Sequence, residues 1–310
     1  MLKNRLILAL KILIPLAVFG AVGWKLYESW DKIREIHWSP NYLLLTLSGI
    51  CYAVAYIPAA LYWHYVLKAL GQMPGRYETF RAYYIGHLGK YVPGKVMVLV
   101  IRSGLLNLER TKLSTAAASI FLETMTMMAV GAFVAAMIVF LLLWKGTLEL
   151  PHWLTFLTLG IMCCTVLPIV PPVFHFVAKK CRTELHGLRF RTLAAGWILN
   201  IPVWLMLGGN LWMILLGFGM ESQSIFTELL YCTLAVSMAV VLGFATLIPA
   251  GFGARELVAV LILVPFFQTH PLPIGVADPT VMAGVTVAVQ RIISILSELT
   301  VSALLAWKRR

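Results

Sequence analysis

Apolar residues run almost continuously through this chain, in stretches of about twenty residues that charged residues rarely interrupt. Apolar and polar positions do not alternate with a period of two, which excludes the strands of a membrane β-barrel. A stretch of about twenty apolar residues can cross a bilayer as a helix, which pairs its own backbone amides. The pattern therefore predicts an all-α polytopic membrane protein with about eight transmembrane helices.

The expected spans follow from the positions of these stretches. We place them at about 6–27, 42–67, 114–143, 152–177, 193–217, 228–248, 256–269 and 281–306. The first is too long for the apolar core of a signal peptide, so we expect it to remain as an uncleaved span. The seventh would be only about 21 Å long as a helix, which leaves open whether it crosses the membrane fully.

Basic residues set the expected orientation. The chain has 25 Lys and Arg against 13 Asp and Glu, and 60% of its residues are hydrophobic. With the N-terminus inside, 20 of the basic residues fall on the cytoplasmic side and four on the opposite side. The positive-inside rule then places both termini in the cytoplasm, and we expect a prokaryotic plasma membrane. This distribution accounts for the net charge of +12 without a nucleic-acid partner.

The segment between the second and third spans is not a simple loop. Residues 77–91 mix aromatic and charged side chains, residues 96–101 are apolar, and the motif YVPGK lies at 91–95. Proline ends a helix and glycine permits a sharp reversal, so we expect a broken segment near 77–108. Because 96–101 has no polar face, a re-entrant hairpin is favoured over an amphipathic pair on the cytoplasmic surface.

A second break follows the sixth span, in the stretch IPAGFGARE at 248–256, and we expect a broken segment near 249–269. Matching Pro/Gly interruptions in two parts of a chain point to a transporter site. We therefore expect a single domain over 1–310 with a weak internal repeat, its halves at about 40–177 and 193–307. The sequence leaves open whether this repeat is parallel or inverted.

Among the ionisable residues inside expected spans three stand out, namely Glu123, Arg291 and Glu298, and charges there are costly and functional by default. Arg291 and Glu298 are seven residues apart and project from one helix face. Interhelical ion pairs, for example Arg291 with Glu123 or Arg255 with Glu298, would explain them structurally. These three residues accompany two helix breaks, where helix starts offer free N–H groups and arginines offer bidentate donors. The combination favours a cavity for an anionic head group.

Signatures of enzymes and of metal sites are absent from the sequence. The five cysteines have no zinc-ligand spacing, the seven histidines are scattered, and there is no P-loop or Gly-x-Ser-x-Gly motif. We interpret the cysteines as packing residues. We therefore expect no catalytic residues, no cofactor and no metal.

The two breaks also carry a family resemblance. The stretches GHLGKYVPGKVMVLVIRSGLL (86–106) and IPAGFGARE (248–256) resemble two signatures of the lysylphosphatidylglycerol synthase transmembrane-region family, whose domain is flippase-like. The resemblance implies an eight-helix domain that acts on lipids, and Glu123 resembles a glutamate of that family. Thr124 and Met127 stand where many relatives have Arg and Asp. No soluble acyl-tRNA-using domain accompanies the spans, so lysyl transfer by this chain alone is not expected.

These observations predict a lipid translocase that moves an anionic phospholipid, aminoacyl-lipid or polyprenyl-linked glycolipid between leaflets. The alternatives are a membrane lipid-modifying transferase and a non-catalytic subunit that docks a glycosyltransferase or synthase; a homo-oligomer is also open. We expect Arg102 and Arg255 to hold the phosphate, and Glu123, Arg291 and Glu298 to shape the polar path or couple it to protons. The full set expected to bind the substrate is Pro93, Gly94, Lys95, Arg102, Glu123, Pro249, Gly251, Gly253, Arg255, Glu256, Arg291 and Glu298.

Overall fold

The computed structural model describes residues 40–92, 96–106, 111–146, 152–166, 189–246, 248–270, 272 and 278–307. Within these ranges every regular element is a helix, so the predicted all-α class is confirmed. The expected first span at 6–27, the end of the fourth, and the candidate residues Pro93, Gly94 and Lys95 lie outside the described residues.

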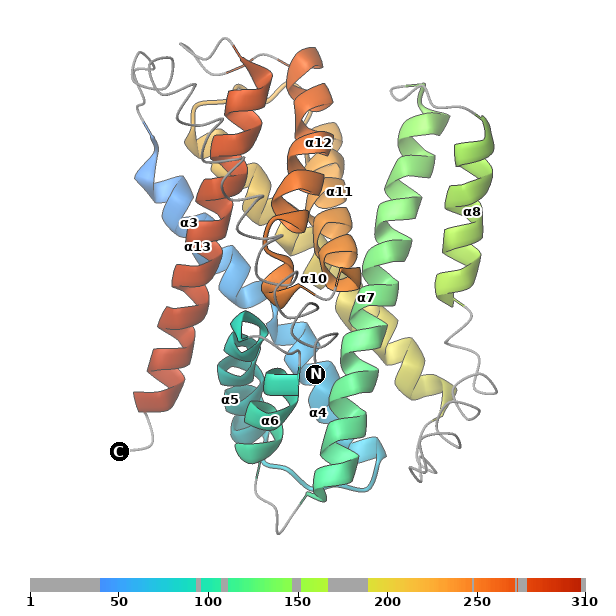
Figure 1. The fold of residues 1–310 in the computed structure, drawn as a ribbon, viewed down its shortest axis with the longest axis vertical. Coiled ribbons are helices and arrows are strands. Elements are labelled where there is room, and N and C mark those ends of the chain that lie inside the picture. The colour runs from blue at the N-terminus through green and yellow to red at the C-terminus, as the bar shows by residue number, and fades with distance from the viewer. Residues whose placement is uncertain are drawn as a thin grey trace, which may run out of the picture. The chain divides into compact units, whose positions relative to one another are not determined.

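Twelve elements are described, and Figure 1 labels most of them. In chain order they are α3 (Tyr42–Ala55), α4 (Ile57–Ala69), α5 (Arg76–His87), η1 (Leu88–Tyr91), α6 (Val96–Gly104), α7 (Leu113–Trp144), α8 (His152–Val166), α10 (Phe190–Gly217), α11 (Ile225–Ala245), η3 (Pro249–Gly251), α12 (Ala254–Thr269) and α13 (Pro279–Trp307). The elements η1 and η3 are short 3-10 helices, and each lies at one of the predicted breaks.

Six helical stretches in the described part of the chain are long and apolar enough to cross a bilayer, so the protein is a multi-pass membrane protein. They are Tyr42–Ala69, Leu113–Trp144, Phe190–Gly217, Ile225–Ala245, Pro249–Thr269 and Pro279–Trp307. Each coincides with an expected span. The seventh expected span is longer than the sequence indicated, because η3 precedes α12 and the two together cover 21 residues.

Contacts divide the chain into two compact units that interleave along the sequence. Unit 1 consists of Met1–Tyr52, Tyr91–Pro93 and Leu207–Leu296, and unit 2 of Ala53–Lys90, Gly94–Met206 and Ser297–Arg310. The elements that begin in one unit and end in the other are α3, η1, α10 and α13. The single domain and the internal repeat stay predictions.

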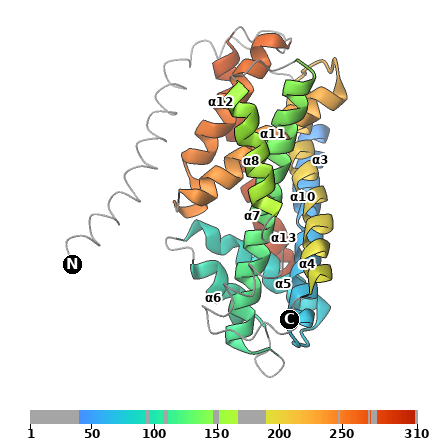
Figure 2. The same cartoon turned by 90° about the vertical axis from the view of Figure 1, so that its right-hand side faces the viewer.

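In unit 2, α4 packs against α5 and α7, and α6 packs against α5. The helices α7 and α8 run side by side (Figures 1 and 2). Glycines permit the close approaches: a Cβ on Gly131 of α7 would lie 2.4 Å from the ring of Trp204, and one on Gly196 would lie 2.5 Å from Tyr62. Both aromatic side chains are fully buried, so these contacts belong to the core of the unit.

In unit 1, α11 and α12 pack against each other and lie side by side (Figure 1). Gly208 of α10 faces α11, since a Cβ there would lie 2.1 Å from Oγ1 of Thr233 and 2.7 Å from its Cα. Asn210, also fully buried, donates from Nδ2 to the carbonyl oxygen of Ser48 at 2.9 Å. Small and polar residues at helix interfaces are the usual means of helix association in membranes.

The start of α11 is built around one carboxylate. Glu228 has no exposed surface and accepts four hydrogen bonds. The donors are Trp212 Nε1 at 2.8 Å, Ser222 Oγ at 2.7 Å, and the backbone amides of Gln223 at 2.7 Å and Ser224 at 3.0 Å. A buried charge is stable when its hydrogen-bonding capacity is filled in this way, so Glu228 fixes the loop that enters α11.

Candidate functional site

The first predicted break is a pair of short helices that pack against each other. The chain passes from α5 through η1 to α6. Gly86 and Gly89 make room for the return of the chain: a Cβ on Gly86 would lie 2.2 Å from Cγ of Arg102, and one on Gly89 would lie 2.7 Å from the backbone nitrogen of Val98. The prediction of two helices around a break is confirmed. Whether this hairpin enters the membrane stays a prediction.

Arg102 and Glu123 form a buried ion pair in unit 2. Nη1 of Arg102 lies 2.7 Å from Oε2 of Glu123, and the two side chains are only 3% and 1% exposed. Oε1 of the carboxylate accepts a hydrogen bond from the hydroxyl of Tyr83 at 3.0 Å. The guanidinium also lies over two aromatic rings, 4.0 Å from the centroid of Tyr83 and 5.3 Å from that of Trp63. The pair thus attaches α6 to α7 through contacts that have no access to water.

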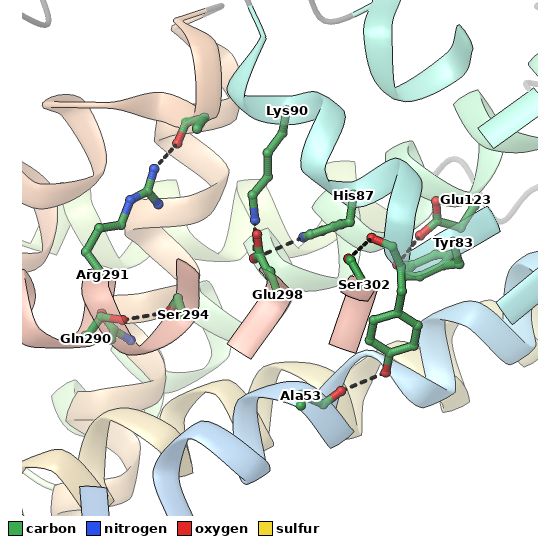
Figure 3. A network of polar contacts seen from close by, with 12 residues as sticks. Ala53, Tyr83, His87, Lys90, Glu123, Gln290, Arg291, Ser294, Glu298 and Ser302 are labelled. Atoms are coloured by element: carbon green, nitrogen blue, oxygen red, sulfur yellow. Dashed lines mark hydrogen bonds and ion pairs between the residues drawn. The ribbon is translucent and has the colours of Figure 1, made fainter. Parts of the chain in front are cut away.

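Glu298 on α13 takes Lys90 of η1 as its partner. Nζ of Lys90 lies 2.5 Å from Oε1 of Glu298, and Nε2 of His87 lies 3.6 Å from the same oxygen. Figure 3 shows both side chains pointing toward this carboxylate. The structure gives Glu123 and Glu298 the partners Arg102 and Lys90 within unit 2, and the pairs suggested by the sequence, Arg291 with Glu123 and Arg255 with Glu298, stay predictions.

Further polar contacts align α5 with the end of α13. The hydroxyl of Ser302 donates to the carbonyl of Tyr84 at 3.3 Å, and Nε of Arg81 donates to the carbonyl of Leu305 at 3.2 Å. The last carbonyls of a helix have no partner within it, so a basic side chain is favourable there. The two helices run in opposite directions, since residues later in α5 meet residues earlier in α13.

The second predicted break is confirmed and has an unusual backbone. Ala250, Gly251 and Gly253 have φ values of 49°, 65° and 83°, which lie in the region that favours glycine. The amide of Gly253 donates to Oε2 of Glu256 at 2.7 Å, and this bond caps the start of α12. The motif PAGFGARE therefore encodes both the reversal and the restart of the helix.

Arg291 of α13 braces this break within unit 1. Its Nη2 donates to the carbonyl of Ala250 at 3.2 Å, and its Nε lies 3.5 Å from Oε1 of Glu256 without forming a hydrogen bond. The guanidinium lies 4.5 Å from the ring centroid of Phe252 and 5.7 Å from that of Tyr91. Tyr91 is the last residue of η1, so one of the two aromatic rings near the Arg291 guanidinium comes from the first break.

Arg255 adds a second positive charge at the same break. A Cβ on Gly243 would lie 2.3 Å from Cγ of Arg255, and one on Gly251 would lie 2.8 Å from it, so the stem of the side chain rests on two glycines. Arg255 is partly exposed, and no hydrogen bond or ion pair is found for its guanidinium among the described residues. Its charge also repels that of Arg291. The second break therefore carries two guanidinium groups, and among the described residues the carboxylate of Glu256 is paired with that of Arg291 only.

Several residues of these networks were not among the expected site residues, notably Tyr83, His87, Lys90, Tyr91 and Phe252. His87, Lys90 and Tyr91 belong to the stretch that carries the family resemblance, and this was the available signal. Tyr83 gave none, because its acceptor lies 40 residues away on another helix. No group of three or more His, Cys, Asp or Glu that could hold a metal ion occurs in the described ranges.

Comparison with known protein families identifies the family of this chain. The model of the family described as lysylphosphatidylglycerol synthase TM region matches residues 9–297, which is most of the chain. No curated protein matches, and no solved structure matches.

Proposed function

Because the chain belongs to the lysylphosphatidylglycerol synthase TM-region family, we propose that it is a lipid translocase that moves a lipid with an anionic head group between leaflets. Anionic phospholipids, aminoacyl-lipids and polyprenyl-linked glycolipids share the phosphate that such a site would recognise. The proposed setting is a prokaryotic plasma membrane with both termini in the cytoplasm, as the distribution of basic residues indicates.

The observation that carries the proposal is the excess of positive charge at the second break. Arg255 and Arg291 both lie at this break, and the carboxylate of Glu256 is near Arg291 and already accepts a hydrogen bond from the amide of Gly253. An unbalanced guanidinium at membrane depth is costly unless an anion completes the site. Arginine binds phosphate with two parallel hydrogen bonds, and Arg255 has no other partner among the described residues.

The ion pair of unit 2 is assigned a different role. Arg102 is almost fully buried and bonded to Glu123, so phosphate could reach it only by displacing that carboxylate. We therefore assign the phosphate contact to Arg255 and Arg291, and to Arg102 and Glu123 the positioning of the first hairpin. Glycines 251 and 253 serve the site by allowing the backbone reversal that brings Arg255 and Arg291 together.

The test is leaflet exchange of fluorescently labelled phosphatidylglycerol in proteoliposomes, followed by chemical bleaching of the outer leaflet. The wild-type protein should accelerate exchange over empty vesicles, and Arg255→Ala should slow it at least about tenfold, the effect of losing a charged hydrogen bond. Arg191→Ala is the matched control, because Arg191 is an exposed arginine at the start of α10, and this variant should behave as wild type.

Two outcomes would contradict different parts of the proposal. If Arg255→Ala exchanged the lipid as fast as Arg191→Ala, the phosphate site would be misplaced. If the wild-type protein moved no anionic lipid, the translocase assignment would fail. Co-purification of a stoichiometric glycosyltransferase or synthase would then identify the chain as a docking subunit.

A further inference from the structure

Within unit 2, two basic side chains approach a single carboxylate oxygen. Oε1 of Glu298 lies 2.5 Å from Nζ of Lys90 and 3.6 Å from Nε2 of His87 (Figure 3). Glu298 is 5% exposed, so its carboxylate is withdrawn from water. The side chains of His87 and Lys90 are 17% and 18% exposed, and the atom Nε2 of His87 is itself buried. At neutral pH a lysine is charged, whereas a histidine changes its charge between about pH 5 and 8.

The surroundings of His87 make its ring the group that changes charge. Its ring stacks on Tyr83, with centroids 6.2 Å apart and planes 18° apart, and lies 4.6 Å from the ring of Tyr56. Burial, followed by the charge of Glu123, raises the pKa of Tyr83 well above its usual range, so this phenol stays neutral. Behind Tyr83 lie Arg102 of α6 and Glu123 of α7, which neutralise each other. Within the part of the chain that the structure describes, Lys90 of η1 and Glu298 of α13 are charged neighbours of His87 in this network.

We propose that His87 is a proton sensor that competes with Lys90 for Glu298 and so controls the attachment of η1 to α13. When His87 is neutral, Lys90 and Glu298 form a neutral pair. When His87 is protonated, two cations face one carboxylate in a site with little water, and one of them becomes unfavourable.

The cation that leaves is Lys90. His87 is the last residue of α5 and packs against the rings of Tyr56 and Tyr83, which restrict the motion of its ring. Lys90 lies on a four-residue 3-10 helix, an element with weak hydrogen-bond geometry, and its side chain is long and flexible. The attachment is therefore present at pH values above the range in which His87 titrates, and it is lost as the pH falls through that range.

Release of Lys90 has a consequence for the next residue. Tyr91 follows Lys90 directly, and in unit 1 its ring lies 5.7 Å from the guanidinium of Arg291. A loosened η1 would therefore also loosen the aromatic cover of Arg291. The relevance of this loosening to lipid binding at Arg291 rests on the proposed function. The competition of His87 and Lys90 for Glu298 rests on the contacts of unit 2 and does not depend on that function.

Hydrogen exchange of the full chain in lipid nanodiscs, measured by mass spectrometry at pH 8.0 and pH 5.5, tests the proposal. After correction for the intrinsic pH dependence of exchange, the amides of Leu88–Tyr91 should lose about fivefold in protection at pH 5.5, the effect expected for one lost ion pair. In the His87→Gln variant, protection of these amides should be the same at pH 5.5 and at pH 8.0, and equal to that of the wild-type protein at pH 8.0. Glu298→Gln should show low protection at both.

The controls separate this switch from general damage. Ser302→Ala removes a non-ionisable contact between α5 and α13 and should retain the wild-type pH response. Protection of the α7 amides reports whether a variant is folded, and Lys90→Gln replaces Glu298→Gln if the latter does not fold. A wild-type pH response in His87→Gln, or no response in the wild-type protein, would overturn the proposal. If the wild-type protein moved no lipid but kept its pH response, the proposed translocase function would fail and the proton sensor would stand.

Discussion

The ion pair between Arg102 and Glu123 should be costly to break and much less costly to replace as a whole. Glu123→Gln removes one charge of a pair whose atoms are 2.7 Å apart and whose side chains are 3% and 1% exposed. The guanidinium then stays in a nearly water-free position, with aromatic rings but no anion to balance it. Removal of one partner of a buried pair typically costs about 3–5 kcal/mol.

The double variant Arg102→Met, Glu123→Gln isolates the interaction. It removes both charges, fills the space of the arginine stem, and leaves an amide oxygen to accept the hydrogen bond from Tyr83. A buried pair replaced by an apolar side chain is often neutral in stability. We therefore expect the double variant to lie within about 2 kcal/mol of the wild-type protein, and above Glu123→Gln alone.

Thermal unfolding in detergent micelles, followed by tryptophan fluorescence, measures the difference. Trp63 lies next to the pair and donates to Ser119 at 3.0 Å, so its emission reports on this part of unit 2. The expected cost corresponds to a decrease in Tm of roughly 5–15 °C for Glu123→Gln. A single variant with the wild-type Tm, or a double variant less stable than the single one, would refute the assignment of a structural role to this pair.

Three further substitutions test the packing with the same unfolding measurement. Glu228→Gln should cost about 2–3 kcal/mol, because its donors lose a charged acceptor, whereas Glu221→Gln on the exposed loop should cost almost nothing. Gly208→Ala should cost about 1–3 kcal/mol through its contact with α11, and Gly209→Ala, which has no atom within 4 Å, should be neutral or stabilising; equal effects would contradict the packing of α10 on α11. Ala250→Gly should stabilise the protein by about 1 kcal/mol, because Ala250 has a φ of 49°, and a decrease in Tm would exclude strain there.

The sequence predicts the spans well because their signal is local. An apolar stretch of about twenty residues is visible without knowledge of any partner, and six expected spans recur as long apolar helices. Both breaks were predictable for the same reason, since proline and glycine act on their own backbone. The length of the seventh span was underestimated, because its start was placed at residue 256, after the break. In the structure the side chain of Glu256 folds back onto Gly253 and caps α12, and η3 extends the helical stretch to Pro249.

The partners of the charged residues were not predictable in the same way. Lys90 and Glu298 are 208 residues apart, and their pairing depends on how α5 docks on α13. Glu228 was overlooked because a carboxylate in the first turn of a span usually lies at the wet interface. Its complete burial follows from an indole, a hydroxyl and two amides that the sequence does not bring together. Such networks are properties of the packed helices rather than of any one segment.

The two breaks share one packing arrangement. In each, an arginine after the break rests its stem on a glycine of the helix before the break. These contacts join Arg102 to Gly86 in unit 2 and Arg255 to Gly243 in unit 1. A larger residue at either glycine would displace the arginine stem. The internal repeat, parallel or inverted, stays a prediction.

The electrostatics of the two breaks differ, and this difference separates their roles. In unit 2 the hairpin supplies Arg102, the next long helix supplies Glu123, and the pair is neutral and closed to water. In unit 1 the polarity is reversed, since α12 supplies Glu256 and the next long helix supplies Arg291. Arg255 is then left without a carboxylate of its own among the described residues. If the two breaks derive from one ancestor, unit 2 has kept a structural pair, and unit 1 carries the excess positive charge that an anionic head group would balance.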